Sequence, residues 1–335
     1  MVFRRSILSD RQEAAVQKTL QNLRAQRRNR FRILACIDGT DESFVTVRFG
    51  ARYLIQNNCD LIILMVRPID IGMNSGGLQM RLARQSMLDA GFEIPGVKHL
   101  KRALDILKEE GIDVSAWPKE SAHQDAWGDP AGDNKVEYRS PEGRSVVLKL
   151  KTSPDVAHGI LDQYELGPYN LIIVGEPSRW RGEFKSFFDS GVVQTVTTMA
   201  PCSVLVARNS LDKKGYFICT DGSSRSMPAV RRSAVLAHVM GQPITLFSVA
   251  DSPAGKPAAE EAVANAKSLL KAMKIQVAET RVAVGKPAEE IVESGSLYRM
   301  IVVTDEGRSR LQRLFRGSTA TAVVRKARTS VLDVR

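Results

Sequence analysis

The residues best suited to bind a phosphate group lie near the C-terminal end of the chain. Gly307 and Gly317 are separated by nine residues, and Ser318 and Thr319 follow the second glycine directly. A glycine removes side-chain bulk, so backbone N–H groups can close around an anion. Gly317 also opens a predicted helix, whose free N–H groups and dipole favour phosphate. The spacing therefore predicts an anion-binding loop that leads into the N-terminus of a helix.

Three residues at the ends of apolar runs are expected beside this loop. Asp221, Val249 and Thr304 each follow or end a short β-rich run. Ligands of open parallel sheets bind at the carboxyl ends of the strands, so these residues should face the same ligand. Asp221 is placed to accept a hydrogen bond from a ribose hydroxyl or a base edge, and Val249 would offer backbone groups to a base. Arg308 is one of four arginines between the glycines, which would either pair with phosphates or form a solvated basic surface.

The elements that must position these residues occur twice. Asp38 and Asp221 both lie at the end of an apolar run, and they are 183 positions apart. Val66 and Val249 end the next apolar runs, and the same 183 positions separate them. Two apolar runs that share one offset indicate an internal repeat. The expected units are a basic N-terminal helix over 1–30, a first domain over 31–209 and a second domain over 210–335.

Within each copy, short β-rich runs alternate with helical segments, which predicts a parallel sheet with helices on both faces. The expected fold class is α/β, with two repeated five-stranded parallel sheets of Rossmann-like type. The strands expected in the first copy are 32–37, 61–66, 146–151, 171–174 and 203–207, and its helices are 41–57, 97–111, 154–165 and 190–199. The strands expected in the second copy are 216–220, 244–249, 277–284, 300–303 and 330–334, and its helices are 224–240, 256–273, 287–294 and 317–327.

These motifs resemble those of a tandem universal stress protein. That family opens with a strand ending in Asp-Gly-Ser and closes with the pattern G-x2-G-x9-G-[ST], a helix and a last strand. The second copy is similar at Gly307, Gly317 and Ser318, whereas Thr304 stands at the position of the first glycine. The terminal run 329–334 resembles the last strand of the family, which commonly forms the dimer edge.

The resemblance implies an adenine nucleotide alpha hydrolase-like fold. It also implies ATP, ADP or AMP as the ligand of the second domain, with or without Mg²⁺. Self-association through the last strands is implied as well, either in a homodimer or in a pseudo-dimer of the two domains. A protein partner is expected but not identified.

The first copy departs further from the pattern of the family. Asp38 and Val66 keep the positions at the strand ends, and Gly175 keeps the first glycine. Ser178 replaces the second glycine. The closing pair is Ser190-Gly191 in place of Gly-Ser, and two extra residues precede it. Loss of these positions removes the close backbone approach that phosphate needs. We therefore expect a degenerate site in the first domain, without a triphosphate.

The first copy also contains two insertions, at about 70–95 and 115–145. The second insertion ends in a predicted hairpin that pairs 135–139 with 146–151. Long insertions in compact domains tend to be functional or interfacial, so a lid, a dimer contact and a partner surface remain open. The N-terminal helix is expected to pack on a domain or a partner, with contact to acidic lipid or nucleic acid as the alternative.

The net charge is +11 and is unevenly distributed. Residues 1–30 contain 8 Lys/Arg and 2 Asp/Glu, and residues 210–335 contain 20 and 12. Such charge suits anionic partners but also serves solubility. No recognised module or aromatic cluster favours nucleic acid. No apolar run reaches the length of a membrane span, so we expect a cytoplasmic chain that does not enter the membrane.

The cysteines and histidines do not predict a metal site or a catalytic triad. The four cysteines lie in or beside predicted strands, without a C-x-x-C pair, and the four histidines are scattered. Isolated cysteines in strands usually behave as small buried apolar residues. No catalytic residue and no metal ligand is therefore predicted.

The sequence favours a stress-response protein that binds an adenine nucleotide, mainly in its second domain, and acts through conformation or partner contacts. Two alternatives stay open: slow ATP hydrolysis at the same loop, and a nucleotide-free interaction module that uses the insertions and the basic N-terminal segment.

Overall fold

The computed structural model describes residues 30–56, 58–68, 96–126, 129–165, 168–176, 190–304 and 319–335. The predicted N-terminal helix, the first insertion and the segments 177–189 and 305–318 lie outside the described residues. Among the described helices, none is long and apolar enough to cross a membrane.

The first domain is built on the five predicted parallel strands, in the order β7-β6-β1-β2-β5. These are β1 (Phe31–Ile37), β2 (Cys59–Pro68), β5 (Ser145–Ser153), β6 (Leu171–Gly175) and β7 (Ser203–Ala207). The helices are α2 (Asp41–Gln56), α4 (Val97–Glu109), α5 (Val156–Glu165) and α6 (Ser190–Met199). The central strands are apolar on both faces because helices cover both faces of the sheet.

The second domain repeats this plan in the order β12-β11-β8-β9-β10. Its strands are β8 (Tyr216–Cys219), β9 (Ile244–Ala250), β10 (Glu279–Val284), β11 (Met300–Thr304) and β12 (Ser330–Val334). Its helices are α7 (Ser226–Val239), the short 3-10 helix η1 (Pro253–Gly255), α8 (Lys256–Ala272), α9 (Pro287–Gly295) and α11 (Thr319–Lys326). Each of the strands and helices predicted for the described residues is confirmed in type.

The expectation of five strands in each domain is wrong for the first domain. Two further strands, β3 (Lys119–Ala126) and β4 (Asp129–Arg139), form an antiparallel hairpin within the second insertion. The predicted pairing of 135–139 is confirmed, since Lys135 lies opposite Lys149 and Arg139 opposite Ser145. The hairpin continues the sheet beyond β5, whose backbone groups would otherwise form an unpaired edge.

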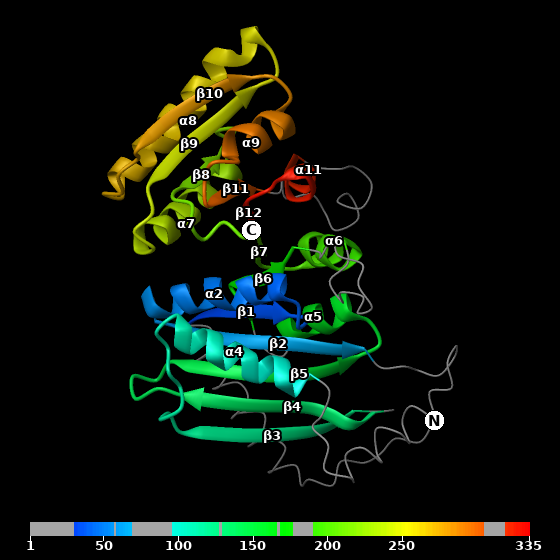
Figure 1. Ribbon diagram of the computed structural model, residues 1–335. Coiled ribbons are helices and arrows are strands. Elements are labelled where there is room, and N and C mark those ends of the chain that lie inside the picture. The colour runs from blue at the N-terminus through cyan, green and yellow to red at the C-terminus, as the bar shows by residue number, and fades with distance from the viewer. Residues whose placement is uncertain are drawn as a thin grey trace, which may run out of the picture.

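In the part of the chain that the structure describes, the two domains share one sheet of 12 strands (Figure 1). The last strand of each domain lies at the junction, where β7 and β12 pair antiparallel, with Leu205 opposite Leu332 and Val206 opposite Val331. Of the two pairings expected for the last strands, the structure shows the one within a single chain. The antiparallel pairing relates the two domains by an approximate two-fold rotation, as in a dimer joined at equivalent edges.

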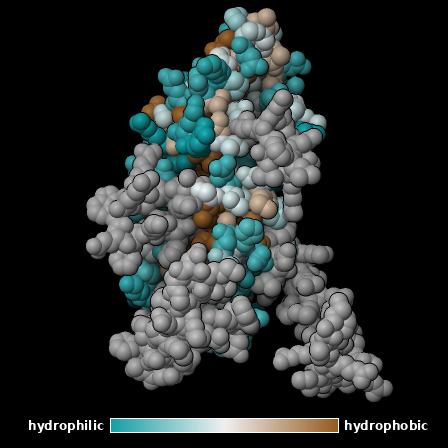
Figure 2. Space-filling view, turned by 90° about the vertical axis from the view of Figure 1, so that its right-hand side faces the viewer, coloured by the Kyte–Doolittle hydropathy of each residue, from teal (hydrophilic) through white to brown (hydrophobic). Residues whose placement is uncertain are grey.

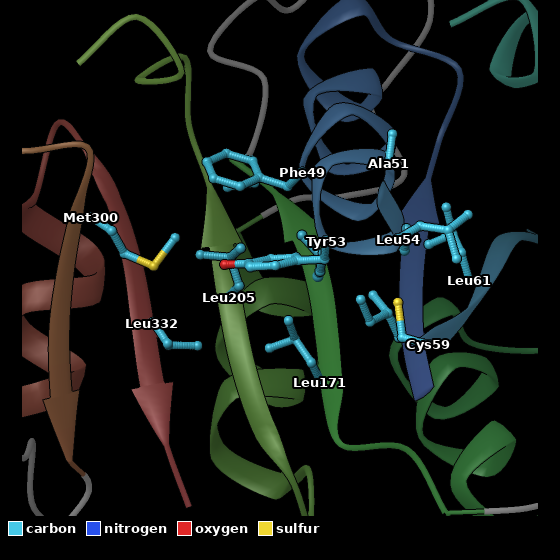
Figure 3. Close-up of a cluster of buried hydrophobic side chains, with 14 of the residues drawn as sticks. Phe49, Ala51, Tyr53, Leu54, Cys59, Leu61, Leu171, Leu205, Met300 and Leu332 are labelled. Carbon is cyan, nitrogen blue, oxygen red and sulfur yellow. The ribbon is translucent and has the colours of Figure 1, made fainter. Parts of the chain in front are cut away.

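A hydrophobic core lies on each face of this sheet and continues from one domain into the other. Side chains alternate along the strands, so Ile33 and Ala35 contribute to one core and Leu34 and Cys36 to the other. Figure 3 shows the first core at the junction, where Phe49 and Tyr53 extend from α2 toward β7 and β12. On the face shown in Figure 2, hydrophilic residues dominate the described surface of the second domain.

The cysteines are free, and three of the four are buried. Burial raises the pKa of Cys59 and Cys202 to about 12, so neither thiol ionises at neutral pH. This agrees with the expectation that these cysteines behave as apolar residues.

Candidate functional site

The loop after β8 presents the predicted Asp221 at the carboxyl end of the sheet. The Oδ1 atom of Asp221 accepts a hydrogen bond of 2.9 Å from the backbone N–H of Ser223. The Thr220 hydroxyl accepts from the backbone N–H of Gly222 at 3.1 Å and lies 3.0 Å from the Ser226 hydroxyl. Gly222 has a φ of +74°, in the region that glycine adopts without strain. These contacts hold the turn closed and leave Asp221 exposed at its rim.

A cavity of about 510 Å³ opens directly beside this turn. Asp221, Val249, Thr304 and Thr319 all line it, although they come from four separate parts of the chain. Asp221 follows β8, Val249 and Thr304 lie at the ends of β9 and β11, and Thr319 begins α11. These three strands are neighbours in the sheet of the second domain (Figure 1). The structure therefore brings together every predicted site residue of the second domain that it describes. Gly307, Arg308, Gly317 and Ser318 lie outside the described residues.

Six further polar residues line the cavity and were not predicted: Thr220, Ser223, Arg225, Ser226, Ser248 and Asp251. Asp251 follows Val249 by two positions, and Arg225 begins the turn into α7. The rule that ligands meet the loops after parallel strands could have found both of them. Their side chains add a carboxylate and a guanidinium to a site that the sequence motif describes only through its glycines.

The charge state of Asp221 is set by opposing effects. Partial burial works against its ionised form, but hydrogen bonds from Ser226 and Ser223 outweigh burial and lower the pKa of the carboxyl. Asp221 is therefore a carboxylate at neutral pH and can only accept hydrogen bonds. Such a group suits hydroxyl or amino donors of a ligand and repels phosphate.

The equivalent turn of the first domain is closed in on itself. Asp38 is only 8% exposed, and its Oδ1 atom accepts hydrogen bonds from the backbone N–H and the hydroxyl of Thr40, at 2.9 and 2.6 Å. The imidazole of His99, from α4, lies directly over Gly39, where an added Cβ would be 2.6 Å from the ring. In the second domain the small Ala262 takes this place against Gly222. Helix α4 thus places a larger side chain over the turn than α8 does.

The other predicted residues of the first domain do not gather around a described cavity. Val66 is buried in β2, with only 4% of its surface exposed. Gly175 ends β6, and an added Cβ would lie 3.1 Å from the Cα of Ser43. Gly191 belongs to α6, and Ser178 lies outside the described residues.

Comparison with known proteins agrees with this double architecture. A model of the universal stress protein family matches residues 29–208 and, a second time, residues 217–335. The chain belongs to the universal stress protein family. It carries two universal stress protein domains in tandem, each with the Rossmann-like α/β fold.

Solved universal stress proteins share the arrangement of both domains. One from Archaeoglobus fulgidus DSM 4304 is 16% identical and aligns over 91% of this chain and 98% of its own, with a TM-score of 0.58. A putative universal stress protein from Pseudomonas aeruginosa UCBPP-PA14 is 12% identical over 92% of this chain and 94% of its own, with a TM-score of 0.59. At such identities the likeness shows the fold. The comparison with curated proteins gave no match.

A third structure, of a universal stress protein from Archaeoglobus fulgidus in complex with dAMP, covers 36% of this chain and 98% of its own. It is 20% identical, with a TM-score of 0.31.

Proposed function

We propose that the second domain binds an adenine nucleotide in the cavity beside Asp221, and that the bound nucleotide regulates conformation or partner contacts. The observation that carries this proposal is the convergence of Asp221, Val249, Thr304 and Thr319 on one cavity of about 510 Å³. That volume lies within the range of roughly 300–1,000 Å³ typical of small-molecule sites.

The lining residues divide between the two ends of a nucleotide. Asp221, as a carboxylate, accepts hydrogen bonds from ribose hydroxyls, and Val249 offers backbone groups to the base. Thr319 begins α11, where helix N–H groups favour phosphate. We assign Gly307, Arg308, Gly317 and Ser318 to the phosphates on their sequence pattern alone.

We propose no nucleotide in the first domain. The Asp38 carboxylate already has Thr40 as its hydrogen-bond donor, and the ring of His99 lies over the turn. A ligand that approached as in the second domain would have to displace the ring and compete with Thr40. The nucleotide would therefore contact the second domain alone. To affect the first domain, it must bind two conformations of the chain with unequal affinity.

Thermal unfolding with ATP, ADP or AMP, each with and without Mg²⁺, tests this proposal. A ligand at 100 times its Kd stabilises the folded state by about 2.7 kcal/mol, which raises the unfolding midpoint by several degrees. Gly317→Asp should abolish the rise, because it places a carboxylate where phosphate is expected. Asp221→Ala should reduce it. Asp38→Asn is the matched control in the first domain and should keep the rise.

No rise with any nucleotide, in protein purified free of ligand, would contradict the proposal. The nucleotide-free interaction module would then be favoured, with the β3–β4 hairpin as a surface to test. The cytoplasmic location belongs to this proposal and rests on composition alone. A homodimer would have to form at another edge or face, because the two last strands are already paired with each other.

A further inference from the structure

A second, larger cavity of about 730 Å³ lies between the two domains. One wall is formed by α7, which presents Arg232 and Leu236. The opposite wall is formed by the first residues of β1 and β6, including Phe31 and Leu171, and by the end of β12, including Val334. This inter-domain cavity shares none of its described lining residues with the cavity beside Asp221.

The inter-domain cavity exists because the two equivalent helices differ at the junction. Helix α7 repeats α2 at the offset of 183 positions, and six positions are buried in both. They are Ser43, Thr46, Val47, Gly50, Ala51 and Leu54 in α2, and Ser226, Ala229, Val230, Ser233, Ala234 and Ala237 in α7. The counterparts of the buried Phe49 and Tyr53, however, are Arg232 and Leu236, which line the cavity.

On the α2 side, the junction is filled. Tyr53 extends across it (Figure 3), and its hydroxyl lies 3.0 Å from the hydroxyl of Tyr216 in the other domain. The segment that joins the domains also lies there, because the carbonyl oxygen of Leu211 accepts hydrogen bonds from Arg52 of α2 at 3.5 Å and from Arg299 at 2.8 Å. The chain has only one such connecting segment. On the α7 side, Leu236 is shorter than Tyr53, and no described residue fills the space.

The lining of the inter-domain cavity combines apolar walls with positive charge. The apolar side chains include Phe31, Leu171, Val235, Leu236, Leu332 and Val334. Arg231, Arg232 and Arg335 add three cations, and no Asp or Glu is among the described lining residues. Three cations over an apolar wall favour a ligand of opposite charge with an apolar body.

Arg335 is the most buried of the three cations. Its side chain is about 10% exposed, and its Nε and Nη1 atoms have no hydrogen-bond partner among the described residues. Its Nη2 atom already contacts Asp333 at 3.3 Å and the carbonyl oxygen of Thr197. Arg232 donates to a main-chain oxygen atom of Arg335, the last residue of the sequence. These two atoms are themselves buried and do not face the cavity, so Arg231 and Arg232, which are exposed, are the cations that a ligand there would reach.

We propose that the inter-domain cavity is a second ligand site, for a small molecule with an apolar body and one carboxylate or sulfonate group. The ligand would contact both domains at once, through α7 and β12 of the second and through β1 and β6 of the first. It would therefore bind most tightly to the relative domain orientation seen here.

Fluorescence titration with anilinonaphthalene sulfonate, followed by competition with dodecanoate or 1-dodecanol, tests this site. Leu236→Tyr restores the side chain of the filled junction and should weaken probe binding at least tenfold. Leu297→Tyr is its control, since Leu297 is exposed elsewhere on the second domain. Dodecanoate should displace the probe at a concentration at least tenfold lower than 1-dodecanol requires. Arg231→Gln should reduce this ratio of concentrations.

A second pair of variants guards against misfolding of Leu236→Tyr. Val235 lines the cavity and is 43% exposed, whereas Ile55 on α2 is 45% exposed and outside it. Val235→Asp should weaken binding of the sulfonate, and Ile55→Asp should leave it unchanged. Equal probe affinity in wild type, Leu236→Tyr and Val235→Asp would overturn the proposal, as would equal competition by the acid and the alcohol.

Discussion

The hydroxyl groups of Tyr53 and Tyr216 meet at 3.0 Å across the junction of the two domains. Each residue is only 1% exposed, and 163 positions separate them. Burial raises the pKa of Tyr216 to about 12 and that of Tyr53 above its usual value, so both hydroxyls stay protonated. The pair joins the first residue of strand β8 to helix α2 through two uncharged hydroxyl groups.

Removing one hydroxyl of this pair should destabilise the chain more than removing both. Tyr53→Phe leaves a buried hydroxyl on Tyr216 without its partner, which costs about 1–3 kcal/mol. The double change to Phe at both positions removes the unpaired group and should recover part of that loss. Urea unfolding of the two single variants and the double variant measures this coupling. Strictly additive losses would show that the two hydroxyls do not stabilise each other.

We expect Arg208, at the end of β7, to stabilise the folded chain by linking the two domains. Its guanidinium donates to the carbonyl oxygens of Thr329 and Val324 in the second domain, at 3.1 and 2.6 Å. It also lies 3.2 Å from Glu176 in the first domain. Arg208→Met leaves these buried acceptors without their donor and should cost about 3 kcal/mol of unfolding free energy. The exposed Lys326→Met is the control, and an equal loss in both variants would contradict this role.

Thr304→Gly should tighten nucleotide binding if the second domain is the nucleotide site. Thr304 lines the cavity at the position where the family pattern has its first glycine. Glycine would remove a branched side chain and allow the backbone to approach a ligand more closely. We expect a several-fold lower Kd in calorimetric titration with ATP. A weaker Kd for ATP in Thr304→Gly would contradict the assignment.

His99 should make stability fall at mildly acidic pH. Burial and the neighbouring Lys98 lower the pKa of His99, and Asp38 opposes them without cancelling the shift. Below about pH 6.5 the unfolded chain binds a proton that the folded chain resists, so stability is lost as pH falls toward the lowered value. Above that range both states are neutral at His99 and the effect vanishes. His99→Gln should lose less stability between pH 7.5 and 5.5, as measured by unfolding midpoints, and an identical fall in both proteins would count against this explanation.

The sequence by itself determined the repeat, the order of its elements and part of the lining of the cavity beside Asp221. The shared offset of 183 positions marked the two domains, and apolar runs between helical segments predicted the parallel strands. Asp221, Val249 and Thr304 could be placed together because the carboxyl ends of parallel strands meet at one edge of a sheet. Each of these inferences depends on local pattern or on a general rule of topology.

Only the tertiary structure decided what happens at the sheet edges and between the domains. Strand β3 is a polar run without apolar alternation, so its pairing with β4 had no signal in its own residues. Three features join residues that are distant in sequence: the His99 ring over Gly39, the Tyr53–Tyr216 contact and the cavity beside Leu236. Their positions depend on how helices cross the sheet and on the β7–β12 register. Those are set by the packing of whole surfaces, which no short stretch of sequence encodes.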